Sequence, residues 1–134
     1  MIYFLDADIC IYYFNNTYLH IHEKLMQIAT KDVKIPAMVA AELLYGAEKS
    51  MRREQNISMV TSLLSVYETV PFDAKAIEYY ATIRTELERK GQIIGGNDII
   101  IAATVLAHQG ILVSHNIREY SRIEELKLED WTQS

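Results

Sequence analysis

An apolar run that ends abruptly in two carboxylates opens the chain and most constrains its fold. The first stretch reads MIYFLDADICIYYF, and residues 2–5 have the composition of a buried β-strand. Asp6 and Asp8 follow this strand. Open parallel sheets bind ligands at the carboxyl ends of their strands, so Asp6 is the first candidate functional residue. The alternative is that Asp6 or Asp8 simply caps the next helix.

Strands and helices are predicted to alternate along the chain. The expected strands are residues 2–5, 32–35, 68–72, 111–114 and 126–131, and the expected helices are 18–30, 37–51, 54–66, 74–90 and an apolar segment around Asp98. Asp73 and Asn97 are expected N-caps, and Gly91 is expected to end helix 74–90. This order favours an α/β fold, a three-layer α/β/α sandwich with a mainly parallel sheet.

Length and composition favour a single domain over residues 1–134. Half of the 134 residues are hydrophobic, which is enough for a real core, and no Gly-rich or Pro-rich linker is evident. No apolar run approaches the roughly 18 residues of a membrane span, and Asp6 interrupts the first run too early for a secretory signal. We therefore expect a cytoplasmic protein without membrane association. Cys10 lies in an apolar run and is expected in the core.

Three further polar residues are expected at the same edge of the sheet as Asp6. Glu42 lies on the apolar stripe of a helix, Asp98 lies in the first turn of another, and Asn116 follows an apolar strand. The alternatives are that Glu42 is a solvated helix residue and that Asp98 complements the helix dipole. Carboxylates in one cleft raise one another's pKa unless a cation is present, which indicates Mg²⁺ or Mn²⁺. His115 is expected to be a loop residue rather than a base.

The net charge of −5 argues against a surface that coats nucleic acid, because such surfaces are usually basic. The net charge does not exclude nucleic acid if a metal site gathers Asp6, Asp8, Glu42 and Asp98. Bound cations would then reverse the local field, and the rest of the chain would be nearly neutral.

Four sequence blocks together resemble the VapC toxins of the PIN-domain ribonuclease family. The blocks are LDADICIYYF, AAELLYGAEKS, IGGNDIIIAA and LVSHNIREYSRIEELKLEDW, and the resemblance covers nearly the whole chain. By this resemblance Asp6, Glu42 and Asp98 match the three acidic residues of the family's metal site. Asn116 matches a fourth position, which is Asp or Asn among relatives, and Glu119 is a candidate additional or outer-shell metal residue in the following turn.

The resemblance implies a metal-dependent endoribonuclease that hydrolyses RNA, with tRNA as the expected substrate. Asp6 and Asp98 are expected to hold Mg²⁺, for which Mn²⁺ can substitute. Glu42 is expected to position or deprotonate the attacking water, and Asn116 to hold a water by hydrogen bonding. Candidate phosphate contacts, which are equally well explained as ordinary surface charge, are Arg84, Arg89, Lys90 and Arg118.

The resemblance also implies partners. Relatives form homodimers and are inhibited by a VapB antitoxin, whose C-terminal segment can place an arginine in the acidic cleft. We expect a homodimer and a cognate antitoxin of this type, with the arginine binding the carboxylates bidentately.

The chain departs from the family pattern at its first motif. It reads Asp6-Ala7-Asp8 where VapC chains typically read Asp-Thr-Asn. Asp8 is either an additional metal ligand or outer-shell acceptor, or an N-cap of the following helix. We expect the N-cap, a role in which Asn would serve equally well.

Three other functions were weighed against the ribonuclease. A haloacid dehalogenase-type phosphatase would use Asp6 as nucleophile and Asp8 as acid and base, but its lysine and paired-acid motifs are not evident. A receiver domain needs a phosphorylatable Asp at the end of a central strand, and Asp73 is poorly placed for that. A catalytically silent module that captures an arginine-bearing partner remains the main alternative.

Overall fold

The computed structural model describes residues 1–133, which contain a five-stranded parallel sheet in the order β3-β2-β1-β4-β5. The strands are β1 (Tyr3–Leu5), β2 (Val33–Pro36), β3 (Glu68–Val70), β4 (Ile111–Val113) and β5 (Lys127–Glu129). β1 is central, with β2 and β4 as its neighbours. The strand order reverses between β1 and β4, and this switch point is where such sheets bind ligands.

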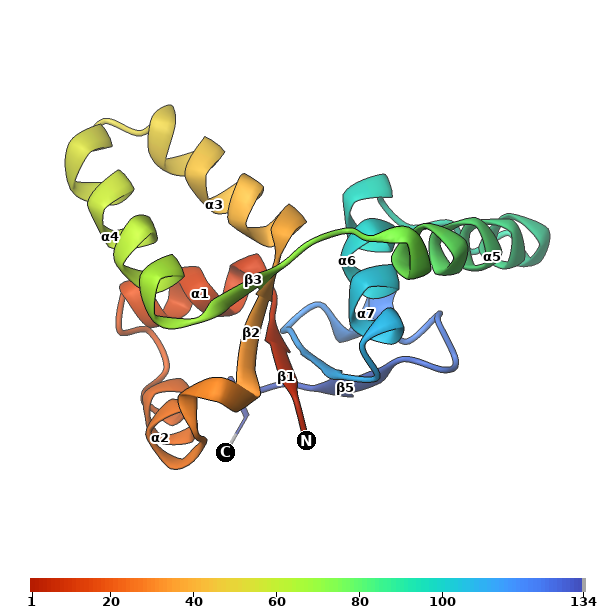
Figure 1. Ribbon diagram of the computed structural model, residues 1–134, viewed down its shortest axis with the longest axis horizontal. Helices are drawn as coiled ribbons and strands as arrows, with labels where there is room; N and C mark the ends of the chain where they lie inside the picture. The colour runs from red at the N-terminus through yellow and green to blue at the C-terminus, as the bar shows by residue number, and fades with distance from the viewer. Residues whose placement is uncertain (134) are drawn as a thin grey trace.

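Helices cover both faces of the sheet, as predicted for a three-layer α/β/α sandwich. They are α1 (Ala7–Phe14), α2 (Leu19–Gln27), α3 (Ala37–Glu48), α4 (Arg53–Val66), α5 (Ala74–Lys90), α6 (Gly96–Ala107) and α7 (Ile117–Tyr120), with a short 3₁₀ turn at Thr30–Asp32. Figure 1 shows α1 to α4 on one side of β1 and β2 and α5 to α7 on the other. Right-handed crossovers require this division, because the chain moves along the sheet in opposite directions before and after β3.

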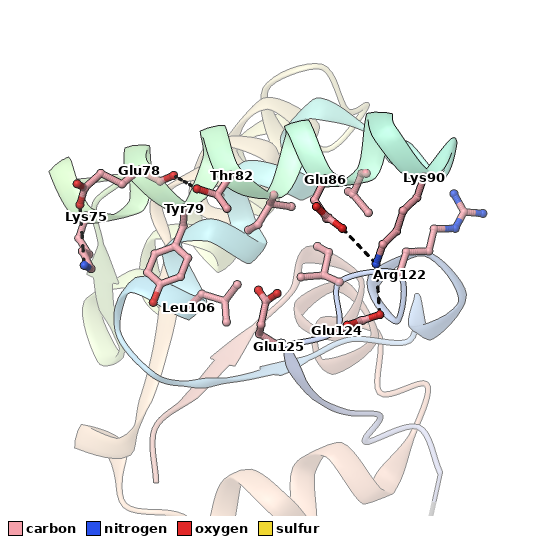
Figure 2. Close-up of a pocket in the computed structure, with 13 residues that line it drawn as sticks. Lys75, Glu78, Tyr79, Thr82, Glu86, Lys90, Leu106, Arg122, Glu124 and Glu125 are labelled. Atoms are coloured by element: carbon pink, nitrogen blue, oxygen red, sulfur yellow. Dashed lines mark hydrogen bonds and ion pairs between the residues drawn. The ribbon is translucent and has the colours of Figure 1, made fainter.

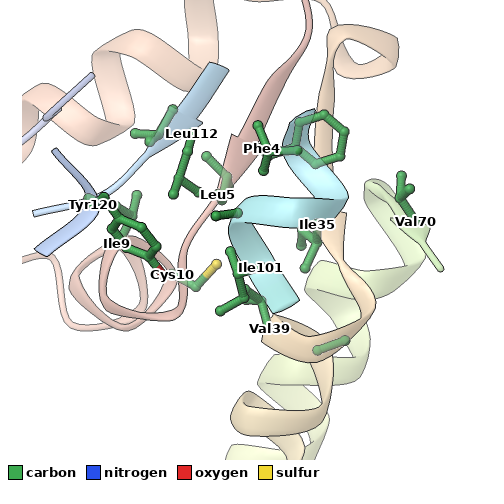
Figure 3. Packing of buried hydrophobic residues seen from close by; sticks show 14 of the residues in the cluster. Phe4, Leu5, Ile9, Cys10, Ile35, Val39, Val70, Ile101, Leu112 and Tyr120 are labelled. Atoms are coloured by element: carbon green, nitrogen blue, oxygen red, sulfur yellow. The ribbon is translucent and has the colours of Figure 1, made fainter. Parts of the chain in front are cut away.

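The core lies between the sheet and these helices. Phe4, Leu112 and Ile101 are fully buried, and Figure 3 shows side chains from β1, β4, α6 and α1 meeting there. Cys10 is 1% exposed and packs in this core, as predicted. Gly110 lets Phe4 approach closely, since a Cβ atom at residue 110 would lie 2.4 Å from the Phe4 ring.

Local signals set some helix ends and not others. Asp73 caps α5 by accepting from the Ala76 amide at 3.0 Å, and Gly91 ends it with a φ of 67°, as predicted. The prediction that Asn97 caps α6 is wrong: Gly95 is the N-cap, and Asn97 already lies inside the helix. Among residues 1–133, no helix is both long and apolar enough to cross a membrane.

Candidate active site

Asp6 lies at the carboxyl end of the central strand and is the N-cap of α1. The residue is 7% exposed, with φ of −79° and ψ of 163°. Its Oδ1 accepts from the Ala7 amide at 2.8 Å, and its Oδ2 accepts from the Ser114 hydroxyl at 2.8 Å. Burial, and then the charge of Asp8, raise the pKa of Asp6 from 3.8 to about 6 despite these hydrogen bonds. The fold therefore holds a poorly solvated carboxylate at the switch point.

Asp98 lies in the first turn of α6 and interacts electrostatically with Asp6. Its Oδ1 accepts from the Tyr120 hydroxyl at 3.2 Å. Burial, then the charge of Asp6, and also Glu119 together raise the pKa of Asp98 to about 6. Tyr120 is itself buried, and burial and the nearby carboxylates raise the pKa of its hydroxyl far above the ordinary value. The Tyr120 hydroxyl therefore stays protonated and donates its hydrogen bond to Asp98.

Glu42 brings a third carboxylate to the same place from α3. Burial raises the pKa of Glu42, and the charges of Asp6 and Asp98 raise it further, while the Asn97 side chain acts in the opposite direction. The charge of Asp6 thus raises the pKa of both Glu42 and Asp98, and the charge of Asp98 also raises that of Glu42. The fold brings these three predicted residues close enough together for their charges to interact.

Asn116 and Glu119 occupy the turn that follows β4. Asn116 is the N-cap of α7, and its backbone amide donates to Ser114 Oγ at 3.0 Å. Its side-chain amide donates to Glu119 Oε2 at 2.9 Å. This contact orients the Asn116 side chain, and within residues 1–133 its Oδ1 has no hydrogen-bond donor.

Asp8 is not the N-cap of α1, so that prediction was wrong. The helix begins two residues earlier than an N-cap at Asp8 would require, and Asp6 is its N-cap. Asp8 lies in the first helical turn, where its Oδ1 accepts from the Ile9 amide at 2.7 Å. Its Oδ2 accepts from the His115 amide at 3.0 Å, and burial raises its pKa. Asp8 thus ties the start of α1 to the loop that carries Asn116.

Comparison with known proteins identifies the family. The model of the PIN domain family matches residues 3–126. The chain belongs to the PIN-domain family. It is 44% identical over 132 residues to Ribonuclease VapC2 of Rickettsia felis, covering 98% of each chain. It is 35% identical over 129 residues to the tRNA(fMet)-specific endonuclease VapC of Salmonella typhimurium, covering 96% of this chain and 97% of that one.

Solved structures of complexes confirm the relationship. A crystal structure of VapBC2 from Rickettsia felis, bound to a DNA fragment from the promoter, matches with a TM-score of 0.92 and 43% identity. That match covers 98% of this chain and 99% of the other. DNA-bound VapBC from Salmonella typhimurium also matches with a TM-score of 0.92, at 34% identity and 98% coverage of both chains. The resemblance seen in four sequence blocks is confirmed, and the phosphatase and receiver interpretations have no support.

Two residues that organise the site of this PIN domain were missed by sequence reasoning. Ser114 is fully buried and contacts both Asp6 and Asn116, and Tyr120 supports Asp98. A serine that closes an apolar strand immediately before two polar residues was an available signal for Ser114. Tyr120 had no such signal, because an aromatic residue in an apolar pattern is usually a core residue.

The residues fit a magnesium ion held partly by water. In the part of the chain that the structure describes, no three His, Cys, Asp or Glu side chains are grouped closely enough to hold a metal ion. Mg²⁺ often binds through only one or two carboxylates and keeps several waters. Asp6 and Asp98 carry carboxylate oxygens of the kind such a site needs, and burial is the main reason that the pKa of each is raised. The donor chemistry therefore suits Mg²⁺ or Mn²⁺.

The three candidate RNA-binding residues on α5 all form ion pairs with glutamates. Arg84 pairs with Glu88 at 3.2 Å, and Arg89 pairs with Glu86. Lys90 lies 3.6 Å from Glu86 and 3.2 Å from Glu124. Figure 2 shows Lys90 bridging one end of a groove of about 490 Å³ between α5 and residues 122–125. Asp6, Asp8, Glu42 and Asp98 do not line this groove.

Arg118 differs from the three cations on α5. It is exposed on α7, one residue before Glu119 and two after Asn116. Of the four basic candidates, it is the one that the fold places beside the acidic residues.

Proposed function

We propose that this protein is a magnesium-dependent endoribonuclease, the toxin of a toxin-antitoxin pair, and that it hydrolyses phosphodiester bonds in tRNA. The observation that carries the proposal is the placement of Asp6, Glu42 and Asp98 at the switch point of the sheet, where the charge of Asp6 raises the pKa of both other carboxyl groups. Family membership supports the reaction class, since the curated relatives are named ribonucleases and endonucleases.

Each residue of the site has a role in this hydrolysis. Asp6 and Asp98 would hold Mg²⁺, which when bound supplies a Lewis acid that activates water and neutralises charge on the phosphate. Glu42, whose pKa is raised, is suited to take the proton of the attacking water. The Asn116 carbonyl, oriented through Glu119, accepts from a water at the site.

Ser114 and Tyr120 hold the two metal-binding carboxylates in place. Each donates a hydrogen bond to one carboxylate and is itself buried. Such outer contacts fix the geometry of ligands and contribute to metal affinity.

The partner in this proposal is a VapB-type antitoxin, and the toxin forms a homodimer. The solved relatives are described as VapBC complexes, two of them bound to DNA. An arginine of the antitoxin would meet an acidic cleft in which charge is uncompensated, and it would compete with Mg²⁺ for the same carboxylates. An RNA substrate and this partner would place the protein in the cytoplasm.

The test is cleavage of transcribed tRNA(fMet) by purified protein, with Mg²⁺, with Mn²⁺ or with excess EDTA. We expect cleavage with either metal and none in EDTA, and Asp98→Asn should abolish cleavage while keeping the fold. Asp32→Asn is the matched control, because Asp32 lies in the 3₁₀ turn before β2 and should leave cleavage unchanged. Equal cleavage in EDTA would overturn the proposal. Binding of tRNA without cleavage would instead indicate a silent binding module.

A further inference from the structure

His115 lies in the loop that carries Asn116, and its backbone is fixed independently of its side chain. The His115 amide donates to Asp8 Oδ2 at 3.0 Å, which holds the loop at the switch point. The imidazole packs edge-on against Tyr12, with ring centroids 6.2 Å apart and an interplanar angle of 75°. Replacing the side chain therefore leaves the backbone anchor in place.

The ring is held by residues that follow β5. Nδ1 of His115 lies 3.0 Å from Asp130 Oδ2 and 3.1 Å from the Thr132 hydroxyl. Thr132 donates its hydroxyl and its backbone amide to Asp130 Oδ1, at 2.7 and 2.9 Å. Burial raises the pKa of Asp130, but the hydrogen bonds from Thr132 and His115 outweigh burial, and the pKa lies below its usual value.

These contacts assign the tautomer. Asp130 is an ionised acceptor, so the hydrogen bond at Nδ1 requires that Nδ1 carries the proton. In the neutral ring Nε2 then presents a lone pair. Among the described residues Nε2 has no hydrogen-bond partner, and the side chain is 45% exposed while that of Asp130 is 15% exposed. A partly buried carboxylate thus holds a ring whose Nε2 is an acceptor open to solvent.

A free acceptor beside a phosphodiesterase site selects a particular part of RNA. Phosphate oxygens can only accept hydrogen bonds, so they do not complement Nε2. The donor that recurs along an RNA backbone is the ribose 2′-hydroxyl, which also distinguishes RNA from DNA. We propose that His115 accepts a hydrogen bond from one ribose 2′-hydroxyl of the bound RNA, and that Asp130 and Thr132 are positioning residues for this contact. This inference rests on the proposed ribonuclease function and names the feature of the substrate that the site selects.

The chain contains a matched control. His108 and Asp73 form a second histidine-aspartate pair, with Nε2 3.3 Å from Oδ2. His108 follows the last residue of α6, whereas Asp98 lies in the first turn, so about 15 Å of helix separates them. His108→Gln removes a comparable pair without altering the site.

The experiment is a scan of a short synthetic RNA that spans the mapped cleavage site, with one ribose at a time replaced by 2′-deoxyribose. At pH 8, where imidazole is normally neutral, we expect one position at which the wild type loses roughly three- to tenfold in kcat/KM, the effect of one neutral hydrogen bond. His115→Ala and His115→Phe should lose this sensitivity, the latter while keeping an aromatic contact with Tyr12. His108→Gln should keep it.

Asp130→Ala tests the positioning role. It should raise KM by roughly three- to tenfold with kcat nearly unchanged, because a ground-state contact is weakened. A wild type without any sensitive ribose, or a His115→Ala profile identical to the wild type, would overturn the inference.

Binding separates this inference from the proposed function. The binding measurement uses the Asp98→Asn variant in EDTA. This variant should bind the all-ribose RNA more tightly than the RNA with the single 2′-deoxyribose. The double variant Asp98→Asn, His115→Ala should bind the two RNAs equally. If the wild type binds RNA but does not cleave it, the proposed activity fails while this binding measurement still decides the role of His115. Equal affinities for both RNAs in Asp98→Asn would overturn the role of His115 alone.

Discussion

Asp6 and Ser114 are 108 residues apart in the sequence, yet the Ser114 hydroxyl donates a 2.8 Å hydrogen bond to Asp6 Oδ2. The Ser114 Oγ also accepts a hydrogen bond from the Asn116 backbone amide at 3.0 Å. Because β1 and β4 are neighbours at the switch point, the buried Ser114 hydroxyl connects Asp6 with the loop that follows β4.

Ser114→Ala removes both interactions. It leaves a buried carboxylate oxygen and a backbone amide without a partner, so we expect a loss of about 1–3 kcal/mol in the free energy of unfolding, measured in urea. The concentration of Mg²⁺ at half-maximal cleavage should rise roughly tenfold, as for other residues that orient ligands. Ser114→Thr keeps the hydroxyl and is the control. An unchanged Mg²⁺ requirement in Ser114→Ala would show that Ser114 only fills space.

Asp8→Asn tests the corrected role of Asp8. Both carboxylate oxygens accept from backbone amides, those of Ile9 and His115. A side-chain amide has one acceptor oxygen, so it can serve only one of the two. In hydrogen exchange measured by NMR, one of these two amides should exchange at least roughly fivefold faster, since it loses about 1 kcal/mol or more of protection. Continued protection of both amides would restore the interpretation in which Asn and Asp are equivalent here.

The elements that the sequence predicted well are those with local signals. Asp73 and Gly91 bound α5 as predicted, because an N-cap side chain and a left-handed glycine act within one turn of chain. Asp6 and Asp98 were found because strand ends and helix starts are visible in the pattern of apolar residues. The last strand was predicted at 126–131 but spans Lys127–Glu129, since Trp131 turns inward to the core.

The remaining features depend on contacts between distant segments. Asp8 looked like a cap from its neighbours, and only the position of β4 beside β1 brings the His115 amide to its second oxygen. Tyr120 reads as a core aromatic, and only the packing of α7 near α6 turns its hydroxyl toward Asp98. Local periodicity carries no information about such pairs.

Without metal, stability should depend on pH through Asp6. Burial raises the pKa of Asp6 from its ordinary value of 3.8 to about 6 in the fold, so the folded state holds an additional proton between these pH values. The contribution of Asp6 to the free energy of unfolding is therefore most favourable below pH 4. It falls as the pH rises from 4 to 6 and is least favourable above pH 6. The cost of the charged form is on the order of 3 kcal/mol.

Asp6→Asn isolates this effect. In EDTA at pH 7.5 the variant should be more stable than the wild type in urea unfolding, and the gain should vanish near pH 4. Saturating Mg²⁺ should reverse the order, because it stabilises only the wild type. If Asp6→Asn is less stable than the wild type in EDTA at both pH values, the carboxylate serves the fold mainly as a helix cap.

Tyr120→Phe should change the pH dependence of cleavage. The Tyr120 hydroxyl lowers the pKa of Asp98 by donating to Oδ1, so its removal should raise that pKa further. A larger fraction of Asp98 is then protonated at mildly acidic pH and cannot hold a cation. The acidic limb of the plot of kcat/KM against pH should therefore move to higher pH in Tyr120→Phe. Tyr79→Phe, on α5 and lining the separate groove, should leave the limb in place. Identical acidic limbs for Tyr120→Phe and the wild type would show that ionisation of Asp98 does not control the reaction.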